Sequence, residues 1–150
     1  MLIKRIYDQE EYEIALSIRK KVFIEEQNVN KTIEIDEYEN TSIHFLAYYN
    51  DKPVGTGRFR TISSLEASPQ YKGFLKFERI ATLREARNQG IGSALMQYMI
   101  KVAKENFPDY LPILYAQEGA VGFYQKLGWN LVGETFLEAN IIHQKMTLPH

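Results

Sequence analysis

A long helical pattern between two strand-like runs constrains the fold more than any other feature of this sequence. The apolar residues of Ile91–Phe107 recur at the spacing of one helix face, and Pro108 ends the pattern. The strand-like run Gly73–Thr82 precedes this helix, and the short apolar run Leu111–Ala116 follows it. Strands and helices that alternate along one chain predict a mixed α/β structure built in layers.

The remainder of the chain extends this order on both sides. A strand and a helix are expected first, and Asp8 followed by Glu11 three residues later is typical of a capped helix start. A polar and acidic stretch leads into two strand-like runs that predict a hairpin, and a short helix and two strands come last. The flanking elements are expected at 2–7, 9–26, 43–49, 53–62, 119–127, 129–136 and 141–148, which gives the order β-α-β-β-β-α-β-α-β-β.

Length and composition fit a single domain over residues 1–150. A chain of 150 residues can bury about 70% of its unfolded surface in one core. Hydrophobic residues make up 45% of the chain and charged residues 25%, a composition typical of a globular rather than a disordered protein. The formal net charge of −1 predicts no nucleic-acid partner, so any nucleotide that the protein binds should be small. The absence of cysteine excludes disulfides, thiolate metal sites and a thiol nucleophile.

Neither a membrane nor a metal is expected as a partner. The N-terminal stretch lacks the apolar segment of a signal peptide, and no apolar run approaches the roughly 18 residues that span a bilayer. A cytoplasmic location is therefore the default expectation. The three histidines, His44, His143 and His150, lie in separate segments, and without cysteine support they predict no metal site.

The connection into the long helix has residues that suit an anion-binding turn. The segment consists of Arg87, Asn88, Gln89, Gly90, Ile91 and Gly92. The first N–H groups of a helix have no partner within it, and glycine lets the backbone approach a phosphate closely. A loop that packs tightly on a helix can show the same two glycines, so both interpretations stay open on the segment alone. The segment has neither the Gly-Lys-Ser/Thr ending of a P-loop nor the three glycines of a dinucleotide-binding turn.

The whole pattern resembles the GNAT acyltransferases. The run Glu78–Thr82, four intervening residues and then RNQGIGSALM are similar to the core motif of that family, Arg/Gln-x-x-Gly-x-Gly/Ala after a strand. The segment AVGFYQKLGWNLVG at 120–133 resembles the family's Phe-Tyr-x-Lys-x-Gly-aromatic segment. The first half, including PVGTGRFR, resembles small stand-alone bacterial members, so the resemblance covers nearly the whole chain.

This resemblance implies a fold, a cofactor and an acceptor. The fold would be a strongly bent mixed sheet of about six to seven strands, flanked by about four helices and splayed between the strands at Thr82 and Leu111. The cofactor would be acetyl-CoA, with coenzyme A as product, and its pantetheine arm would pair with the backbone of Ile80, Ala81 and Thr82. Residues 87–92 would hold the pyrophosphate. The acceptor would be a primary amine on a small molecule or a protein.

Two residues are candidates for the chemistry of acyl transfer. Tyr124 occupies the position of the family's catalytic tyrosine, and a phenol can protonate or hydrogen-bond a departing thiolate. The alternative is that Tyr124 only packs its helix on the sheet. Glu78 lies two residues before Ile80, so the two side chains share a face and Glu78 can serve as a direct or water-mediated base. The alternative is a structural ion pair with Arg58, Arg60 or Arg79.

Polar residues near the first helix are candidates for the acceptor site. The resemblance places Glu26 and Gln27 at the acceptor pocket, although a helix-end hydrogen bond explains them equally well. The acidic stretch that includes Asp36 can attract a cationic amine, or it can be a solvated loop. A monomer or a homodimer is expected. Two rivals to the enzyme are a non-catalytic acyl-CoA-binding sensor or interaction module, and a structural domain that binds no coenzyme.

Overall fold

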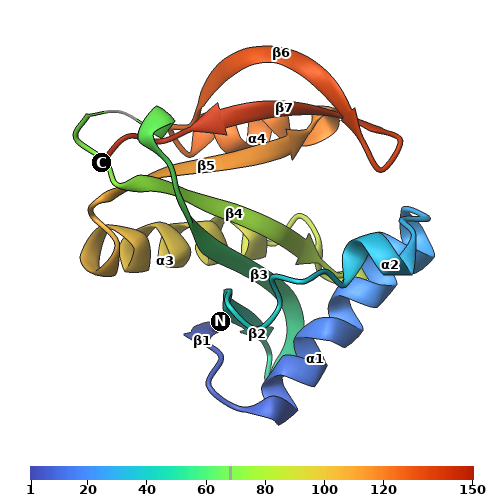
Figure 1. The fold of residues 1–150 in the computed structure, drawn as a ribbon. Helices are drawn as coiled ribbons and strands as arrows, with labels where there is room; N and C mark the ends of the chain where they lie inside the picture. Colours follow the sequence, from blue (N-terminus) through green and yellow to red (C-terminus); the bar gives the residue numbers. More distant parts are fainter. Residues whose placement is uncertain (68) are drawn as a thin grey trace. The chain divides into compact units, whose positions relative to one another are not determined.

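The chain folds into two compact units, each built from two stretches of sequence. The computed structural model describes residues 1–67 and 69–150, with only the backbone at 32 and 33. The first unit comprises Met1–Phe59 and Arg79–Ile100, and the second comprises Arg60–Glu78 and Lys101–His150. Figure 1 shows the elements of both units. The expectation of a single domain over residues 1–150 stays a prediction.

The strands form a seven-stranded sheet in the order β1-β2-β3-β4-β5-β7-β6. They are β1 Leu2–Arg5, β2 Ile43–Tyr49, β3 Lys52–Ser63, β4 Gly73–Thr82, β5 Tyr110–Gln117, β6 Asn130–Glu138 and β7 Ile141–Thr147. β4 and β5 are parallel, whereas β2 is antiparallel to β1 and β3, and β7 is antiparallel to β5 and β6. This mixed sheet confirms the expected fold class. The register of β4 with β5 ends where Phe77 faces Leu114, five residues before the end of β4.

The helices are α1 Gln9–Arg19, α2 Lys31–Glu34, α3 Ile91–Asn106 and α4 Val121–Lys126. A π-helix, Lys20–Glu26, continues α1, so the helix expected over 9–26 is one stretch whose second part is wound more loosely. Asp8 Oδ1 accepts a hydrogen bond from the Glu11 amide at 2.8 Å, which confirms the expected helix start. About four helices were expected; within 1–67 and 69–150, three α-helices have six or more residues, and α2 has only four.

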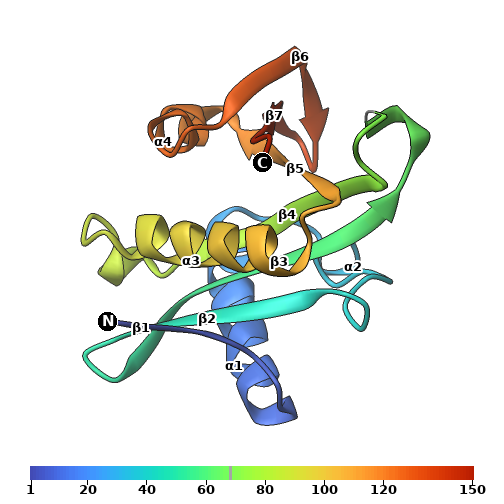
Figure 2. The same ribbon diagram turned by 90° about the vertical axis from the view of Figure 1, so that its left-hand side faces the viewer.

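Two helices cover opposite faces of the strands in the first unit (Figures 1 and 2). Successive residues of a strand point to opposite faces, as Leu46 and Ala47 of β2 do. Leu46 packs in one cluster with Ala15 and Ile18 of α1, and Ala47 packs in a second cluster with Ile91, the first residue of α3. Each of these side chains is at most 3% exposed. Packing of Ile91 against β2 therefore holds the start of α3 in place.

The second unit has its own core on one face of β4, β5 and β7. Phe77, Leu114 and Met146 of these strands are each at most 2% exposed. Trp129 follows α4 and lies edge-on to Phe77, with ring centroids 5.3 Å apart. Gly128 ends the α4 turn with a φ of 97°, a left-handed conformation that glycine adopts without strain. The position of Tyr124 in α4 follows from this packing.

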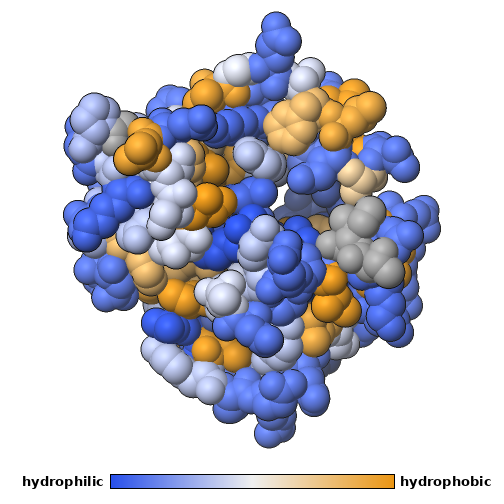
Figure 3. All heavy atoms as spheres, in the orientation of Figure 1, coloured by the Kyte–Doolittle hydropathy of each residue, from blue (hydrophilic) through white to orange (hydrophobic). Residues whose placement is uncertain are grey.

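β6 is one edge of the sheet, and it carries exposed hydrophobic side chains. Leu131 and Leu137 are 51% and 72% exposed, and Ile142 of the neighbouring β7 is 45% exposed. Figure 3 shows hydrophobic groups over the end of the β6–β7 hairpin. β7 lies between β5 and β6, so the last strand in the sequence is not the edge of the sheet.

Six charged side chains of the first unit form a closed cycle of ion pairs, which we call the ion-pair ring. Each arginine binds two carboxylates and each carboxylate binds two arginines. The order is Arg19, Glu34, Arg79, Asp36, Arg58, Glu39 and back to Arg19. The N–O distances include 2.7 Å from Arg19 to Glu39 and 2.7 Å from Arg79 to Glu34. The ring connects α1, β3 and β4 with the acidic residues that precede β2. Its three positive and three negative charges cancel.

We expect Arg19→Ala to destabilise the protein by about 3–5 kcal/mol, because it leaves Glu34 and Glu39 buried with one arginine fewer each. Glu34 is 2% exposed and Glu39 is 8% exposed, so water cannot replace the lost partner fully. Urea unfolding followed by circular dichroism measures the loss. The neighbouring exposed Lys20 supplies the control, since Lys20→Ala should change stability by less than about 0.5 kcal/mol. Equal midpoints for the two variants would contradict a stabilising ring.

Candidate functional site

The turn from β4 to α3 presents backbone donors at the start of a helix. After the short 3-10 helix Arg84–Ala86, Asn88 and Gly90 adopt left-handed backbone conformations with φ of 64° and 77°. The first intrahelical hydrogen bond of α3 runs from the Ala94 amide to the Gly90 carbonyl, at 3.1 Å. The amides of the three residues between Gly90 and Ala94 therefore have no acceptor within the helix. Donors in this arrangement can bind an anion such as a phosphate.

The conformation of Gly90, rather than crowding, explains the glycine at this position. A Cβ added at Gly90 would meet no atom within 4 Å, and the residue is exposed. Its φ of 77° lies in the left-handed region, where a residue with a side chain is strained. Asn88 and Gln89 are exposed as well, so the turn is open to a ligand.

The side chain of Arg87 is bound to another predicted site residue. Its two terminal nitrogens lie 2.7 and 2.9 Å from the carboxylate oxygens of Glu26, and its Nε donates to the Thr82 carbonyl at 3.0 Å. The hydrogen bond from Arg87 lowers the pKa of Glu26, which keeps that carboxylate ionised. The structure thus joins two residues that the sequence assigned to different ligands, Arg87 to the pyrophosphate and Glu26 to the acceptor.

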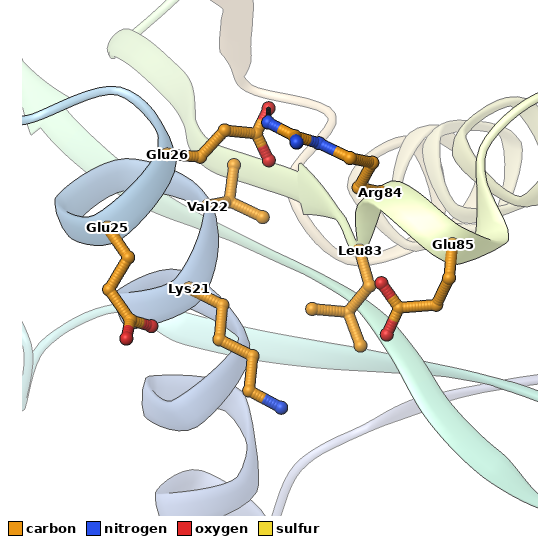
Figure 4. A pocket seen from close by; sticks show the side chains of 7 residues that line it. All are labelled: Lys21, Val22, Glu25, Glu26, Leu83, Arg84 and Glu85. Atoms are coloured by element: carbon orange, nitrogen blue, oxygen red, sulfur yellow. Dashed lines mark ion pairs between the residues drawn. The ribbon is translucent and has the colours of Figure 1, made fainter.

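A cavity of about 360 Å³ lies between the end of the π-helix and the residues after β4 (Figure 4). It is lined by charged side chains and two apolar ones: Lys21, Val22, Glu25, Glu26, Leu83, Arg84 and Glu85. Figure 4 shows Arg84 extended toward Glu26, with Nη2 3.8 Å from Oε2. Charges of both signs make this wall suitable for a polar group rather than for an apolar chain.

The last three residues of β4 are Ile80, Ala81 and Thr82, the predicted pantetheine edge. Gly57 of β3 allows close packing here, because a Cβ on it would lie 2.8 Å from both Ile80 Cδ1 and Met99 Sδ. Ala81 is 4% exposed. The carbonyl of Thr82 is already an acceptor for Arg87, so it is braced by the same side chain that holds Glu26.

Asp36, a predicted acceptor-binding residue, belongs to the ion-pair ring. Its Oδ2 lies 2.6 Å from Arg58 and 3.1 Å from Arg79. Burial alone would raise the pKa of Asp36, but the hydrogen bond and charge of Arg58 outweigh it and lower the pKa to about 2. Its negative charge is shared with two arginines, which reduces its attraction for a cationic amine. Gln27, another predicted acceptor-binding residue, ends the π-helix. Its backbone N–H donates to the Val22 carbonyl at 3.1 Å.

We expect the contribution of Asp36 to stability to disappear in acid. Its folded pKa of about 2 is below the ordinary 3.8, so the contribution is complete above about pH 4 and is lost as the pH falls through 2. Urea unfolding at pH 5 and pH 2.5 should show wild type losing about 1–2 kcal/mol more than Asp36→Asn. Glu37→Gln, at the exposed neighbouring position, should follow wild type. Parallel losses in wild type and Asp36→Asn would rule out this source of acid sensitivity.

Glu78 pairs with two cations of the second unit. Arg60 Nε and Nη2 donate to its two carboxylate oxygens at 3.1 and 3.2 Å, and Lys76 Nζ lies 3.1 Å from Oε1. The side chain of Glu78 is 7% exposed. Of the three arginines that the sequence offered as ion-pair partners, Arg60 pairs with Glu78, and Arg58 and Arg79 are members of the ion-pair ring.

Tyr124 lies in α4 and is 8% exposed. The ring of Phe123 is edge-on to it, with centroids 5.0 Å apart. Burial raises the pKa of the Tyr124 phenol above its ordinary value of 10, so the phenol stays protonated. In the part of the chain that the structure describes, its hydroxyl has no hydrogen-bond partner, and it therefore retains a donor for a bound group.

The ion-pair ring was not predicted from the sequence, although one signal was present. Arg19 lies four residues after Ala15 and three before Val22, which is the spacing of the buried face of α1. All three side chains are at most 4% exposed. A charged residue on a buried face needs partners of opposite charge, and the acidic stretch before β2 supplies them.

Two kinds of site are missing from the described residues. Across 1–67 and 69–150, no group of three or more His, Asp or Glu side chains is placed so that it can hold a metal ion. None of the helices described there has the length and apolar character needed to cross a bilayer. The absence of a metal and of a membrane partner stays a prediction for the whole protein.

Two proteins of Bacillus subtilis (strain 168) are similar to almost all of this sequence. One, named "Uncharacterized N-acetyltransferase YjcF", is 39% identical, with 93% of each chain covered. The other, named "Uncharacterized protein YyaT", is 37% identical and covers 98% of this chain and 95% of its own. The crystal structure of Escherichia coli ElaA has a TM-score of 0.83 at 24% identity and covers 98% of this chain and 99% of its own.

The fold is shared with an enzyme as well. The crystal structure of an acyl-CoA N-acyltransferase from Pseudomonas aeruginosa has a TM-score of 0.82 at 23% identity, with 97% of each chain covered. The sequence model described as "Acetyltransferase (GNAT) family" matches residues 7–129, which include the turn at 87–92, Glu78 and Tyr124. The chain therefore belongs to the GNAT family of acetyltransferases.

Proposed function

We propose that this protein transfers the acetyl group of acetyl-CoA directly to a primary amine and releases coenzyme A. The observation that carries the proposal is the exposed turn before α3, where left-handed Asn88 and Gly90 precede helix amides without intrahelical partners. Backbone donors at a helix N-terminus suit a pyrophosphate group. Membership in the family supports acyl transfer as the reaction.

In this proposal the turn at 87–92 binds the pyrophosphate mainly through backbone amides. The amide of Arg87 donates to the Arg84 carbonyl at 3.3 Å, and its side chain is shared between Glu26 and Thr82. Arg87 therefore braces the turn, and the amides after it receive the phosphates. The pantetheine arm pairs with the backbone of Ile80, Ala81 and Thr82.

Tyr124 is the proposed donor to the sulfur that leaves the thioester. Acyl transfer requires a neutral amine, attack on the thioester carbonyl and stabilisation of the departing thiolate. A thiol has an ordinary pKa of about 8.5, far below that of a buried tyrosine, so the thiolate does not take the phenol proton completely. Tyr124 instead stabilises the thiolate by donating a hydrogen bond.

Glu78 is the proposed general base, acting directly or through a water molecule. Its carboxylate is paired with Arg60 and Lys76. Glu26, Gln27 and Asp36 are proposed to shape the acceptor pocket. The acceptor is a small-molecule or protein amine, not a nucleic acid or a membrane. We propose a cytoplasmic protein that is a monomer or a homodimer.

Calorimetric titration with acetyl-CoA, with ATP as the control ligand, tests the proposal. Saturable binding of acetyl-CoA but not of ATP is the expected result. Amine acceptors are then compared by thiol release, which has no protein background because the sequence lacks cysteine. Binding without thiol release from any amine would favour a sensor module. A titration without heat, together with an unchanged Tm, would exclude coenzyme binding and leave an interaction domain.

A further inference from the structure

One residue within β4 has a backbone conformation that strands do not use. Arg79 has a φ of 55°, although strand residues flank it on both sides. The left-handed region brings Cβ of an L-residue close to its own backbone, so only glycine, and to a lesser degree asparagine or aspartate, adopts it readily. An arginine at this position needs compensating interactions.

The side chain of Arg79 has these interactions in the ion-pair ring. Its Nε lies 2.7 Å from Glu34 Oε2 and donates to the Glu34 carbonyl at 3.1 Å, and Nη2 lies 3.1 Å from Asp36 Oδ2. Both carboxylates are held in turn by other arginines, Glu34 by Arg19 and Asp36 by Arg58. The partners of Arg79 are thus also held by side chains other than that of Arg79.

The residues immediately after Arg79 form the proposed pantetheine edge. A left-handed residue in a strand changes the direction in which the next N–H and C=O groups point, as in a β-bulge. Ile80, Ala81 and Thr82 are then held laterally, since the Ile80 side chain lies against Gly57 and the Thr82 carbonyl accepts from Arg87. The conformation at residue 79 therefore sets the orientation of the backbone groups that follow.

We infer that Arg79 is a positioning residue for the coenzyme: its ion pairs with Glu34 and Asp36 hold a left-handed backbone that orients Ile80–Thr82. The inference rests on the proposed function, because it takes those three residues as the edge that pairs with pantetheine. It adds a second role for the acidic stretch before β2, which supports the coenzyme edge through Arg79.

A comparison of Arg79→Ala with Arg79→Gly separates this role from simple stabilisation. Both variants lose the same ion pairs, so any difference between them in urea unfolding reflects backbone strain at residue 79. Glycine adopts the left-handed conformation without strain, whereas alanine does not. We expect Arg79→Gly to bind acetyl-CoA within about threefold of wild type and Arg79→Ala to bind roughly tenfold more weakly. Equal dissociation constants for the two variants would overturn the inference.

Asp36→Asn provides a second test in the same titration, without an acceptor present. It should weaken acetyl-CoA binding about fivefold in wild type and have no further effect in Arg79→Gly, since glycine does not need the ion pair. An equal loss in both backgrounds would show that Asp36 acts independently of residue 79, against the inference.

Hydrogen exchange decides the question without a coenzyme. Amides of residues 80–83 should exchange roughly tenfold faster in Arg79→Ala than in Arg79→Gly, because only the alanine variant loses the oriented edge. Equal exchange would overturn the inference even if wild type binds acetyl-CoA. If wild type does not bind acetyl-CoA, the proposed function fails, and the exchange measurement still tests whether Arg79 orients this edge.

Discussion

Gly90→Val should bind acetyl-CoA at least about a hundredfold more weakly than wild type while remaining folded. Valine is strained at a φ of 77°, so the turn shifts away from the conformation that exposes the α3 amides. The fold should survive, because a Cβ at Gly90 meets no atom within 4 Å. Calorimetry measures the affinity, and Tm reports on folding.

Gly133 in β6 supplies a matched control for this variant. It has a φ of 73°, and a Cβ on it also meets no atom within 4 Å. Gly133→Val therefore introduces the same backbone strain at a position outside the proposed coenzyme turn. We expect both variants to lose similar stability and only Gly90→Val to lose binding. Similar affinities of the two variants for acetyl-CoA would show that the turn at 87–92 does not bind the coenzyme.

Tyr124→Phe should lower kcat about a hundredfold and leave the Kd for acetyl-CoA nearly unchanged. The substitution removes the hydroxyl that stabilises the thiolate and keeps the ring that packs on Phe123. Single-turnover kinetics with a reactive amine, compared with calorimetric Kd values, separates the two quantities. Since burial raises the pKa of Tyr124, its ionisation should not reduce kcat of wild type as the pH rises from 8 to 10.

Tyr98→Phe is the matched control for this experiment. Tyr98 of α3 contributes its ring to a contact with Phe45, at a centroid distance of 6.0 Å, and phenylalanine preserves that contact. Its kcat should therefore equal that of wild type. A Tyr124→Phe variant with the kcat of Tyr98→Phe would remove Tyr124 from the mechanism.

The sequence predicted the secondary structure well where periodicity and turn residues agree. β4 has the predicted bounds Gly73–Thr82, and the hairpin of β2 and β3 turns at Asn50 and Asp51, both left-handed. These features are local, because they depend on residues that are neighbours in the chain. The change from α1 to a π-helix at Lys20 has no such local signal, since the same apolar spacing fits both helices.

The candidate site was harder to predict, because ion pairs join residues that are distant in sequence. The resemblance identified Arg87 and Glu26 as site residues, yet nothing in their spacing of 61 residues predicted that they bind each other. The ion-pair ring likewise combines residues from 19 to 79. The sequence around a charged residue does not determine which of several distant residues of opposite charge it pairs with.

The ion-pair ring has a consequence for how related sequences can differ. Each of its six members pairs with two ring members of opposite charge, so losing any one member leaves two groups with one partner fewer, at least one of which is buried. A second change that removes an adjacent opposite charge restores neutrality. Homologous chains should therefore keep all six charges or lose them in adjacent pairs, such as Arg58 together with Asp36, and covariation among these positions should be strong.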